Sequence, residues 1–152
     1  MPDNYKILPV ALADFDNWRS LSIELWPEHS VAEMERENQR IFDSLNDIAF
    51  VARTDAGESI GFIDLSIRHD YVAGANSSPV AYVEGIYVRS AYRKQGIGEA
   101  LIRQAEQWGL SKGCTELASD ALLGNEMSHQ FHQRAGFKEV ERVVAFIKTI
   151  PS

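Results

Sequence analysis

The sequence is poor in cysteine, because Cys114 is the only one among 152 residues. A single thiol excludes an intramolecular disulfide framework and a cysteine-rich zinc site. Lys and Arg total 15 against 22 Asp and Glu, for a formal net charge of −7. This balance argues against a general nucleic-acid binder, which usually has a basic face. It fits either a cationic partner or a charge that serves only solubility.

Long hydrophobic runs are also missing. No apolar stretch approaches the roughly 18 residues of a membrane span. The N-terminus lacks the basic segment and the apolar segment of a secretory signal. We therefore expect a cytoplasmic protein that does not bind a membrane.

Length and composition predict one globular domain over residues 1–152, with 45% hydrophobic and 24% charged residues. Internal repeats, low-complexity tracts and linker-like stretches are not found. The expected strands cover residues 6–10, 48–53, 63–67, 80–88 and 115–119, with one or two more in 137–150. The expected helices begin at Asp14 or Asp16, behind Ser30, near Gly96 and at Asn125. This order, an antiparallel meander followed by a β-α-β unit, predicts a mixed-sheet α/β fold.

Two burial patterns follow from periodicity. The helix behind Ser30 is expected to place Met34, Ile41, Phe42 and Leu45 inward. The strand at 63–67 alternates apolar and polar residues, which predicts that only one of its faces is buried.

A strand, a short loop, a pair of glycines and a helix succeed one another over residues 83–98. Gly96 and Gly98 let a ligand approach the backbone, and the first N–H groups of the helix lack intrahelical partners. With the helix dipole and the cations Arg89, Arg93 and Lys94, these groups suit a diphosphate. The segment is neither a Walker loop nor the Gly-x-Gly-x-x-Gly dinucleotide fingerprint.

Residues 93–98 resemble the Arg/Gln-x-x-Gly-x-Gly/Ala signature of the GNAT (Gcn5-related) N-acetyltransferases. A second block, residues 125–137, is similar to that family's Asn-x-x-small-x-x-Phe-Tyr-x-x-x-Gly-Phe pattern. The resemblance implies a GNAT acyl-CoA-transferase fold, with a mostly antiparallel central sheet that splays at the CoA site and helices that flank it.

Further segments resemble the aminoglycoside 6'-N-acetyltransferases; these are residues 25–29, 66–72, 77–80, 83–86, 118–120 and 139–143. The resemblance implies acetyl transfer from acetyl-CoA to the 6'-amino group of an aminoglycoside, by direct attack in a ternary complex. Antibiotic resistance would follow, and a homodimer is implied as well. Two other hypotheses are a GNAT enzyme that acts on a polyamine or a protein amine, and a non-catalytic acyl-CoA-binding domain.

Acetyl-CoA is the cosubstrate that the resemblance implies. Its arm would lie along the strand edge and its diphosphate on the glycine-rich loop. The implied cofactor contacts are Ile86, Tyr87, Val88, Arg93, Lys94, Gln95, Gly96, Ile97, Gly98, Asn125 and His132. His132 departs from the family, in which many members have a tyrosine that acts as the acid toward the thiolate. A histidine there could serve as that acid or hydrogen-bond the cofactor, or it could simply lie on the helix surface.

Glu84 is the implied catalytic residue, because the attacking amine must lose a proton and a carboxylate can receive it directly or through water. The resemblance also implies that the substrate contacts Trp26, Tyr71, Glu84, Asp120 and Glu141. Carboxylates and aromatic faces suit a polycation. Each residue also has an ordinary alternative: a solvent-facing strand acid, a helix cap or core packing. The histidines lack metal-ligand spacing, so we expect no metal, and Cys114 is expected to be a small buried residue.

Overall fold

The structure, a computed structural model, describes residues 4–152 of the chain. They fall into two compact units that meet in the sequence after Asp120. The first unit contains β1 (Tyr5–Pro9), α1 (Phe15–Leu25), α2 (Val31–Asp43), β2 (Asp47–Thr54), β3 (Ser59–Arg68), β4 (Val80–Val88), α3 (Ile97–Ser111) and β5 (Leu117–Ser119). Short 3-10 helices at Leu12–Asp14 and Ser90–Tyr92 precede α1 and α3. The second unit contains α4 (Glu126–Arg134).

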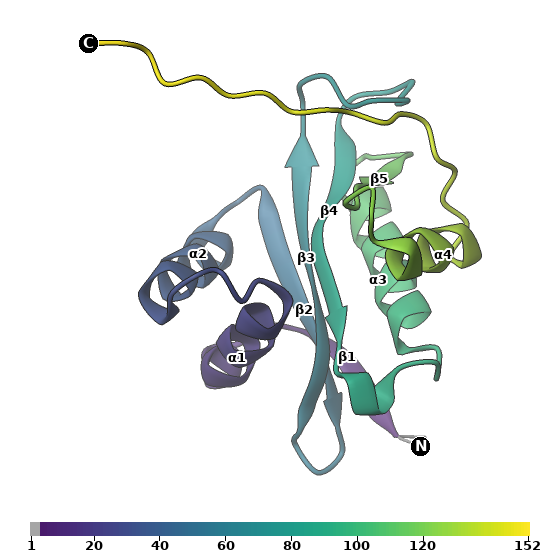
Figure 1. Cartoon of the computed structure of the whole chain (residues 1–152). Helices are drawn as coiled ribbons and strands as arrows, with labels where there is room; N and C mark the ends of the chain where they lie inside the picture. Colours follow the sequence, from purple (N-terminus) through teal and green to yellow (C-terminus); the bar gives the residue numbers. More distant parts are fainter. Residues whose placement is uncertain (1–3) are drawn as a thin grey trace. The chain divides into compact units, whose positions relative to one another are not determined.

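The sheet of the first unit has the strand order β1-β2-β3-β4-β5. Neighbouring strands are antiparallel except β4 and β5, which the α3 crossover joins in parallel. Helices α1 and α2 lie on one face of the sheet and α3 lies on the other (Figure 1). The predicted mixed-sheet α/β fold is confirmed.

Strand β3 is buried on both faces, so the expectation of a half-buried strand is wrong. Asp64, in its middle, is only 2% exposed and accepts a hydrogen bond from the indole N–H of Trp18 at 3.1 Å. The reason is the helix on each side of the sheet, which covers the polar and the apolar positions alike. Trp18 packs in the same core with Leu21 and Phe62.

The inward face of α2 was predicted in part. Met34 and Ile41 are buried, but Phe42 is 39% exposed and Leu45 is 93% exposed. Leu45 was expected inside and lies outside because α2 ends at Asp43. Beyond that helix end, the 3.6-residue period no longer determines the direction of a side chain.

The second unit has regular structure only in α4. Residues 137–152 form neither helix nor strand, so the expected strands in 137–150 are wrong for the single chain. A strand requires a neighbouring strand to complete its backbone hydrogen bonds. Alternating apolar residues alone do not supply that neighbour.

Candidate active site

The pairing of β4 is irregular at Glu84. Asp64 of β3 lies opposite Gly85 and Leu65 lies opposite Val83, so Glu84 is the extra residue of a β-bulge. On its other side, β4 pairs with β5 only as far as Val83. The edge of β4 from Glu84 to Val88 is therefore open on the β5 side within the described strands. Ile86, Tyr87 and Val88, the predicted contacts of the cofactor arm, lie on this open edge.

Glu84 lies on the face of the sheet that carries α1 and α2. Its Oε2 accepts a hydrogen bond from the hydroxyl of Ser66 at 2.5 Å. Arg68 donates to the same carboxylate from Nε at 3.1 Å and from Nη2 at 2.9 Å to each oxygen. The side chains of Arg68 and Glu84 are 41% and 34% exposed, so a ligand can reach the pair from solvent.

Asp120 follows β5 and is held by Tyr82, which lies two residues before Glu84. The Tyr82 hydroxyl donates to Oδ2 of Asp120 at 2.5 Å. Burial and this bond raise the pKa of Tyr82 well above its ordinary value, so the phenol stays protonated at neutral pH and remains a donor. The structure thus brings Glu84 and Asp120 to one face, with Tyr82 linking β4 to Asp120.

Trp26 follows α1, and the far end of its ring lies against the backbone of Gly85. A Cβ atom at Gly85 would lie 2.4 Å from the ring, a distance that only glycine permits. The indole also packs against Phe62, with ring centroids 6.2 Å apart. Trp26 therefore lies on the sheet beside Glu84. Tyr71, in the loop between β3 and β4, is 84% exposed and available to a ligand.

The turn before α3 has left-handed backbone at two positions, Lys94 (φ 62°) and Gly96 (φ 85°). A Cβ at Gly96 would meet no atom of the described residues within 4 Å, so the space before the helix is open. The side chain of Arg93 donates from Nε to the carbonyl oxygen of Val88 at 2.8 Å, which ties the turn to the end of β4. Helix α3 begins at Ile97, and its first N–H groups lack intrahelical acceptors. The turn can therefore receive an anion.

Two polar residues bear on this candidate anion site. Oε1 of Gln95 is buried and accepts no hydrogen bond from the described residues, and as an acceptor it offers a diphosphate no hydrogen bond. Arg89, expected to add positive charge, lies 3.6 Å from Glu24 and 3.4 Å from Glu58. Its charge is therefore offset locally, and Arg93 and Lys94 are the cations left to favour a diphosphate.

The remaining predicted residues belong to the second unit. Asn125 is the N-cap of α4, where its side-chain oxygen accepts from the backbone N–H of Ser128 at 3.1 Å. His132 lies in α4 with Nδ1 2.7 Å from the carbonyl oxygen of Ser128, and its ring contacts Phe137 edge-on. Glu141 is exposed in the segment without regular structure. The functional roles of these three residues stay predictions.

Ser66, Arg68 and Tyr82 contact the predicted carboxylates, but sequence reasoning did not select them. Ser66 and Arg68 lie two residues apart on β3 and so share a face. That spacing was visible in the sequence, but the bulge in the pairing with β4 was not.

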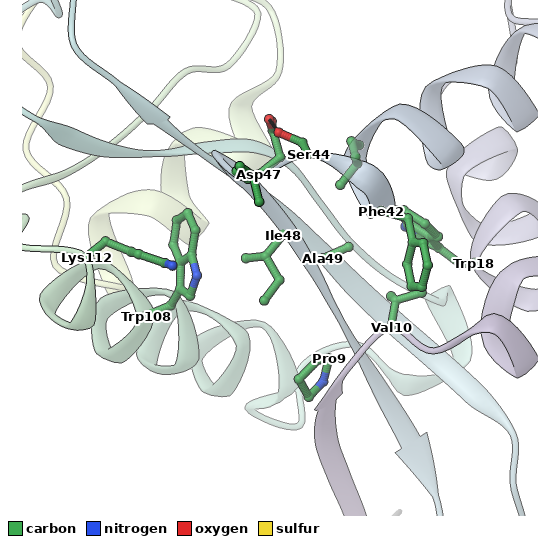
Figure 2. Close-up of a pocket in the computed structure, with 12 residues that line it drawn as sticks. Pro9, Val10, Trp18, Phe42, Ser44, Asp47, Ile48, Ala49, Trp108 and Lys112 are labelled. Atoms are coloured by element: carbon green, nitrogen blue, oxygen red, sulfur yellow. Dashed lines mark hydrogen bonds between the residues drawn. The ribbon is translucent and has the colours of Figure 1, made fainter.

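A cavity of about 340 Å³ lies elsewhere in the first unit. Figure 2 shows Trp108 of α3 and Lys112, which follows that helix, with Trp18 of α1 and Phe42 of α2, around the start of β2. None of the predicted site residues lines it.

Among the described residues, no group of three or more His, Cys, Asp or Glu side chains is placed to hold a metal ion. Of the helices in the described part of the chain, none is long and apolar enough to cross a membrane.

Known proteins resemble this chain in sequence and structure. The model of the acetyltransferase (GNAT) family matches residues 15–137. An aminoglycoside N(6')-acetyltransferase type 1 from Acinetobacter genomosp. 13 is 43% identical over 144 residues, which cover 95% of this chain and 98% of that protein. The crystal structure of the aminoglycoside antibiotic 6'-N-acetyltransferase AAC(6')-Ih from Acinetobacter baumannii has a TM-score of 0.90 and 39% identity, and it covers 97% and 100% of the two chains. AAC(6')-Iy, in complex with the bisubstrate analogue CoA-S-monomethyl-acetylneamine, has a TM-score of 0.92 and 38% identity, with the same coverage.

These matches, together with the open strand edge and the open turn before α3, define an acyl-CoA-dependent transferase. The chain belongs to the GNAT acetyltransferase family and is an N-acetyltransferase.

Proposed function

We propose that the protein transfers the acetyl group of acetyl-CoA to the 6'-amino group of aminoglycoside antibiotics and so gives resistance to them. One observation carries the proposal: pairing between β4 and β5 stops at Val83, immediately before Glu84. The open edge, where an extended amide-bearing arm can pair like a strand, therefore begins beside the carboxylate. Relatives about 40% identical over 95% of the chain are named for this activity, which supports the same substrate class here.

The acetyl donor is assigned to the open edge and the turn. The pantetheine amides would pair along Ile86 to Val88, and the diphosphate would accept hydrogen bonds from the backbone of residues 93–98. Solved relatives in complex with CoA or a CoA-containing analogue support CoA as the ligand. Asn125 and His132 remain proposed cofactor contacts from the second unit.

The reaction requires a neutral amine that attacks the thioester carbonyl. Glu84 would hold the substrate ammonium and accept its proton, directly or through water. The amine forms an amide, and the CoA thiolate leaves and takes a proton; His132 is a candidate donor for that proton. Cys114 is 3% exposed, and burial raises the pKa of its thiol, which disfavours an acetyl-cysteine intermediate and supports direct transfer.

The carboxylates and aromatic rings fit an aminoglycoside, which carries several ammonium groups. Glu84 and Asp120 would each pair with an ammonium group, while Trp26 and Tyr71 would cover the apolar faces of the sugars. Glu141 is a further proposed substrate contact.

The test is release of CoA thiol with kanamycin, tobramycin and spermine, combined with identification of the acetylated nitrogen. We expect saturable turnover of the aminoglycosides, a 6'-amide product and a raised inhibitory concentration in a susceptible bacterial host. Turnover of spermine alone would overturn the proposal in favour of a polyamine acetyltransferase. Binding of CoA without turnover of any amine would support a non-catalytic domain.

Replacement of Glu84 tests its role. Glu84→Ala is expected to lower kcat about ten- to a thousandfold, the usual scale for loss of acid–base assistance. Glu106→Gln, at an exposed position of α3, is the control for the loss of a carboxylate and is expected to match the wild type. Equal turnover in Glu84→Ala and wild type across the pH range would exclude Glu84 as the base.

We also propose that residues 1–152 act as one domain in a cytoplasmic homodimer. The family match extends across both units, which supports a single domain.

The dimer is proposed from the end of the chain. The last 16 residues have no regular structure, and the side chains of Val143, Val144, Phe146 and Ile147 in them are each at least 72% exposed. Such a segment suits the sheet edge of a second copy. Removal of residues 139–152 is expected to halve the mass measured by light scattering; an unchanged mass would place the interface elsewhere.

A further inference from the structure

The two oxygens of Glu84 have different surroundings. Oε2 accepts hydrogen bonds from Ser66 Oγ and from Nε and Nη2 of Arg68. Oε1 accepts only from Nη2 of Arg68, at 2.9 Å, among the described residues. A carboxylate oxygen has two lone-pair directions. Oε2 is therefore saturated, and Oε1 retains one lone pair for a ligand.

Arg68 is itself fixed from a second side. Its guanidinium carbon lies 3.5 Å from the ring centroid of Tyr82, a close cation–π contact. Tyr82 is 8% exposed, and its hydroxyl is committed to Asp120. One arginine therefore contacts both Glu84 and the residue that holds Asp120.

We propose that Arg68 is a positioning residue that fixes the Glu84 carboxylate, with Oε1 as the oxygen that receives the substrate ammonium and its proton. This inference rests on the proposed role of Glu84 in acetyl transfer. The bidentate hydrogen bonds from Arg68 and the hydrogen bond from the hydroxyl of Ser66 prevent rotation of the Glu84 carboxylate. The contact with Tyr82 couples this orientation to the placement of Asp120, so the two anionic subsites keep a constant separation.

The choice of arginine matters for this role. A guanidinium is planar, donates in a fixed fork and stacks on an aromatic ring, whereas a lysine ammonium is a point charge on a flexible stem. Arg68 also offsets one of the two nearby negative charges. Glu84 then offers one lone pair of Oε1, and Asp120 offers Oδ1, the oxygen that Tyr82 does not contact; the two carboxylates suit two separate ammonium groups.

Kinetics of Arg68→Ala, Arg68→Gln and Arg68→Lys test the proposal, on whichever amine the wild type acetylates. We expect kcat to fall about 10- to 100-fold in Arg68→Ala and Arg68→Gln, the scale of a carboxylate displaced by about 1 Å. The KM for acetyl-CoA is expected to stay unchanged, because the cofactor edge and the turn do not involve Arg68. Arg68→Lys is expected to recover only part of the loss. Arg103→Ala, at an exposed position of α3, serves as the matched control.

A double-mutant cycle distinguishes positioning from general damage. Because Arg68 acts through Glu84, Arg68→Ala is expected to change kcat by less than about twofold in a Glu84→Ala background. Equal losses in both backgrounds would overturn the proposal. A rise in kcat/KM in Arg68→Ala would also overturn it, because Arg68 would then block the carboxylate instead of orienting it. Full activity of Glu84→Ala, by contrast, would contradict the proposed role of Glu84, and absence of aminoglycoside turnover in the wild type would contradict the proposed substrate.

Discussion

Asp64 makes the stability of the protein depend on pH. It is 2% exposed in β3. Burial raises the pKa of Asp64 from its ordinary value of 3.8 to about 8, and the negative charges of Glu37, Asp47 and Glu84 act in the same direction. The hydrogen bond from Trp18 acts in the opposite direction and is the smaller effect. At neutral pH the folded protein therefore holds Asp64 as the neutral acid.

The direction of the pH effect follows from proton binding. Below about pH 4 the carboxyl is protonated in both the folded and the unfolded chain. Between pH 4 and pH 8 the unfolded chain loses this proton while the folded chain keeps it, so stability falls as the pH rises. In that window the free energy of unfolding falls by up to about 1.4 kcal/mol for each pH unit. Over the whole window it falls by an amount on the order of 5 kcal/mol. The contribution is complete at the acid end and is lost by about pH 8.

The variant Asp64→Asn isolates this contribution, because an amide does not titrate and its oxygen still accepts from Trp18. Chemical unfolding of both proteins from pH 5 to pH 8 should show the wild type losing free energy of unfolding relative to the variant. Asp43→Asn, an exposed aspartate on α2, controls for the removal of a carboxylate. The kcat of Asp64→Asn at pH 7 is expected to equal that of the wild type. Parallel pH curves for wild type and Asp64→Asn would refute the reasoning.

Two glycine replacements give further predictions. Gly85→Ala forces its Cβ to within 2.4 Å of the Trp26 ring, so we expect a loss of about 1–3 kcal/mol and a higher aminoglycoside KM. Thermal melting and kinetics check this against Gly124→Ala, which has open space around it; equal Tm values would exclude the steric conflict. Gly96→Val puts a β-branched residue at φ 85° in the proposed diphosphate site, so the acetyl-CoA KM should rise while the aminoglycoside KM stays constant. An effect confined to the aminoglycoside would mean that the cofactor lies elsewhere.

Local sequence signals predicted much of the fold around the turn before α3. Residues 80–88 are rich in valine, isoleucine and tyrosine, and the glycines at 96 and 98 precede a periodic apolar pattern. Both signals act within a few residues, so β4, the turn and α3 appear where they were expected. The helix expected behind Ser30 likewise begins there, as α2, because Ser30 and Glu33 form a capping box.

Features that depend on distant partners were not predictable in this way. The alternation around Asp64 shows that its side chain and those of its neighbours point to opposite faces, but not that helices cover both faces. The Trp18 partner lies 46 residues away in the sequence. In the sequence, Arg68 looks like any other cation on a strand. The structure shows that the bulge places Glu84 against it. Leu45 continues the helical spacing of apolar residues, but α2 ends at Asp43, before it.

The bulge at Glu84 unites the separate parts of the site. It gives β4 one residue that lies opposite no residue of β3, and that residue carries the carboxylate. The next residue, Gly85, admits Trp26, and the open edge of the strand begins at the same point. Because Glu84 is the unpaired residue of the bulge, its substitution leaves the backbone pairing of β3 and β4 in place, although Ser66 and Arg68 lose their acceptor. Substitution at Glu84 therefore tests the proposed base without a change of strand register. Deletion of the residue would remove the carboxylate, restore regular pairing and shift Gly85 and the open edge beyond it.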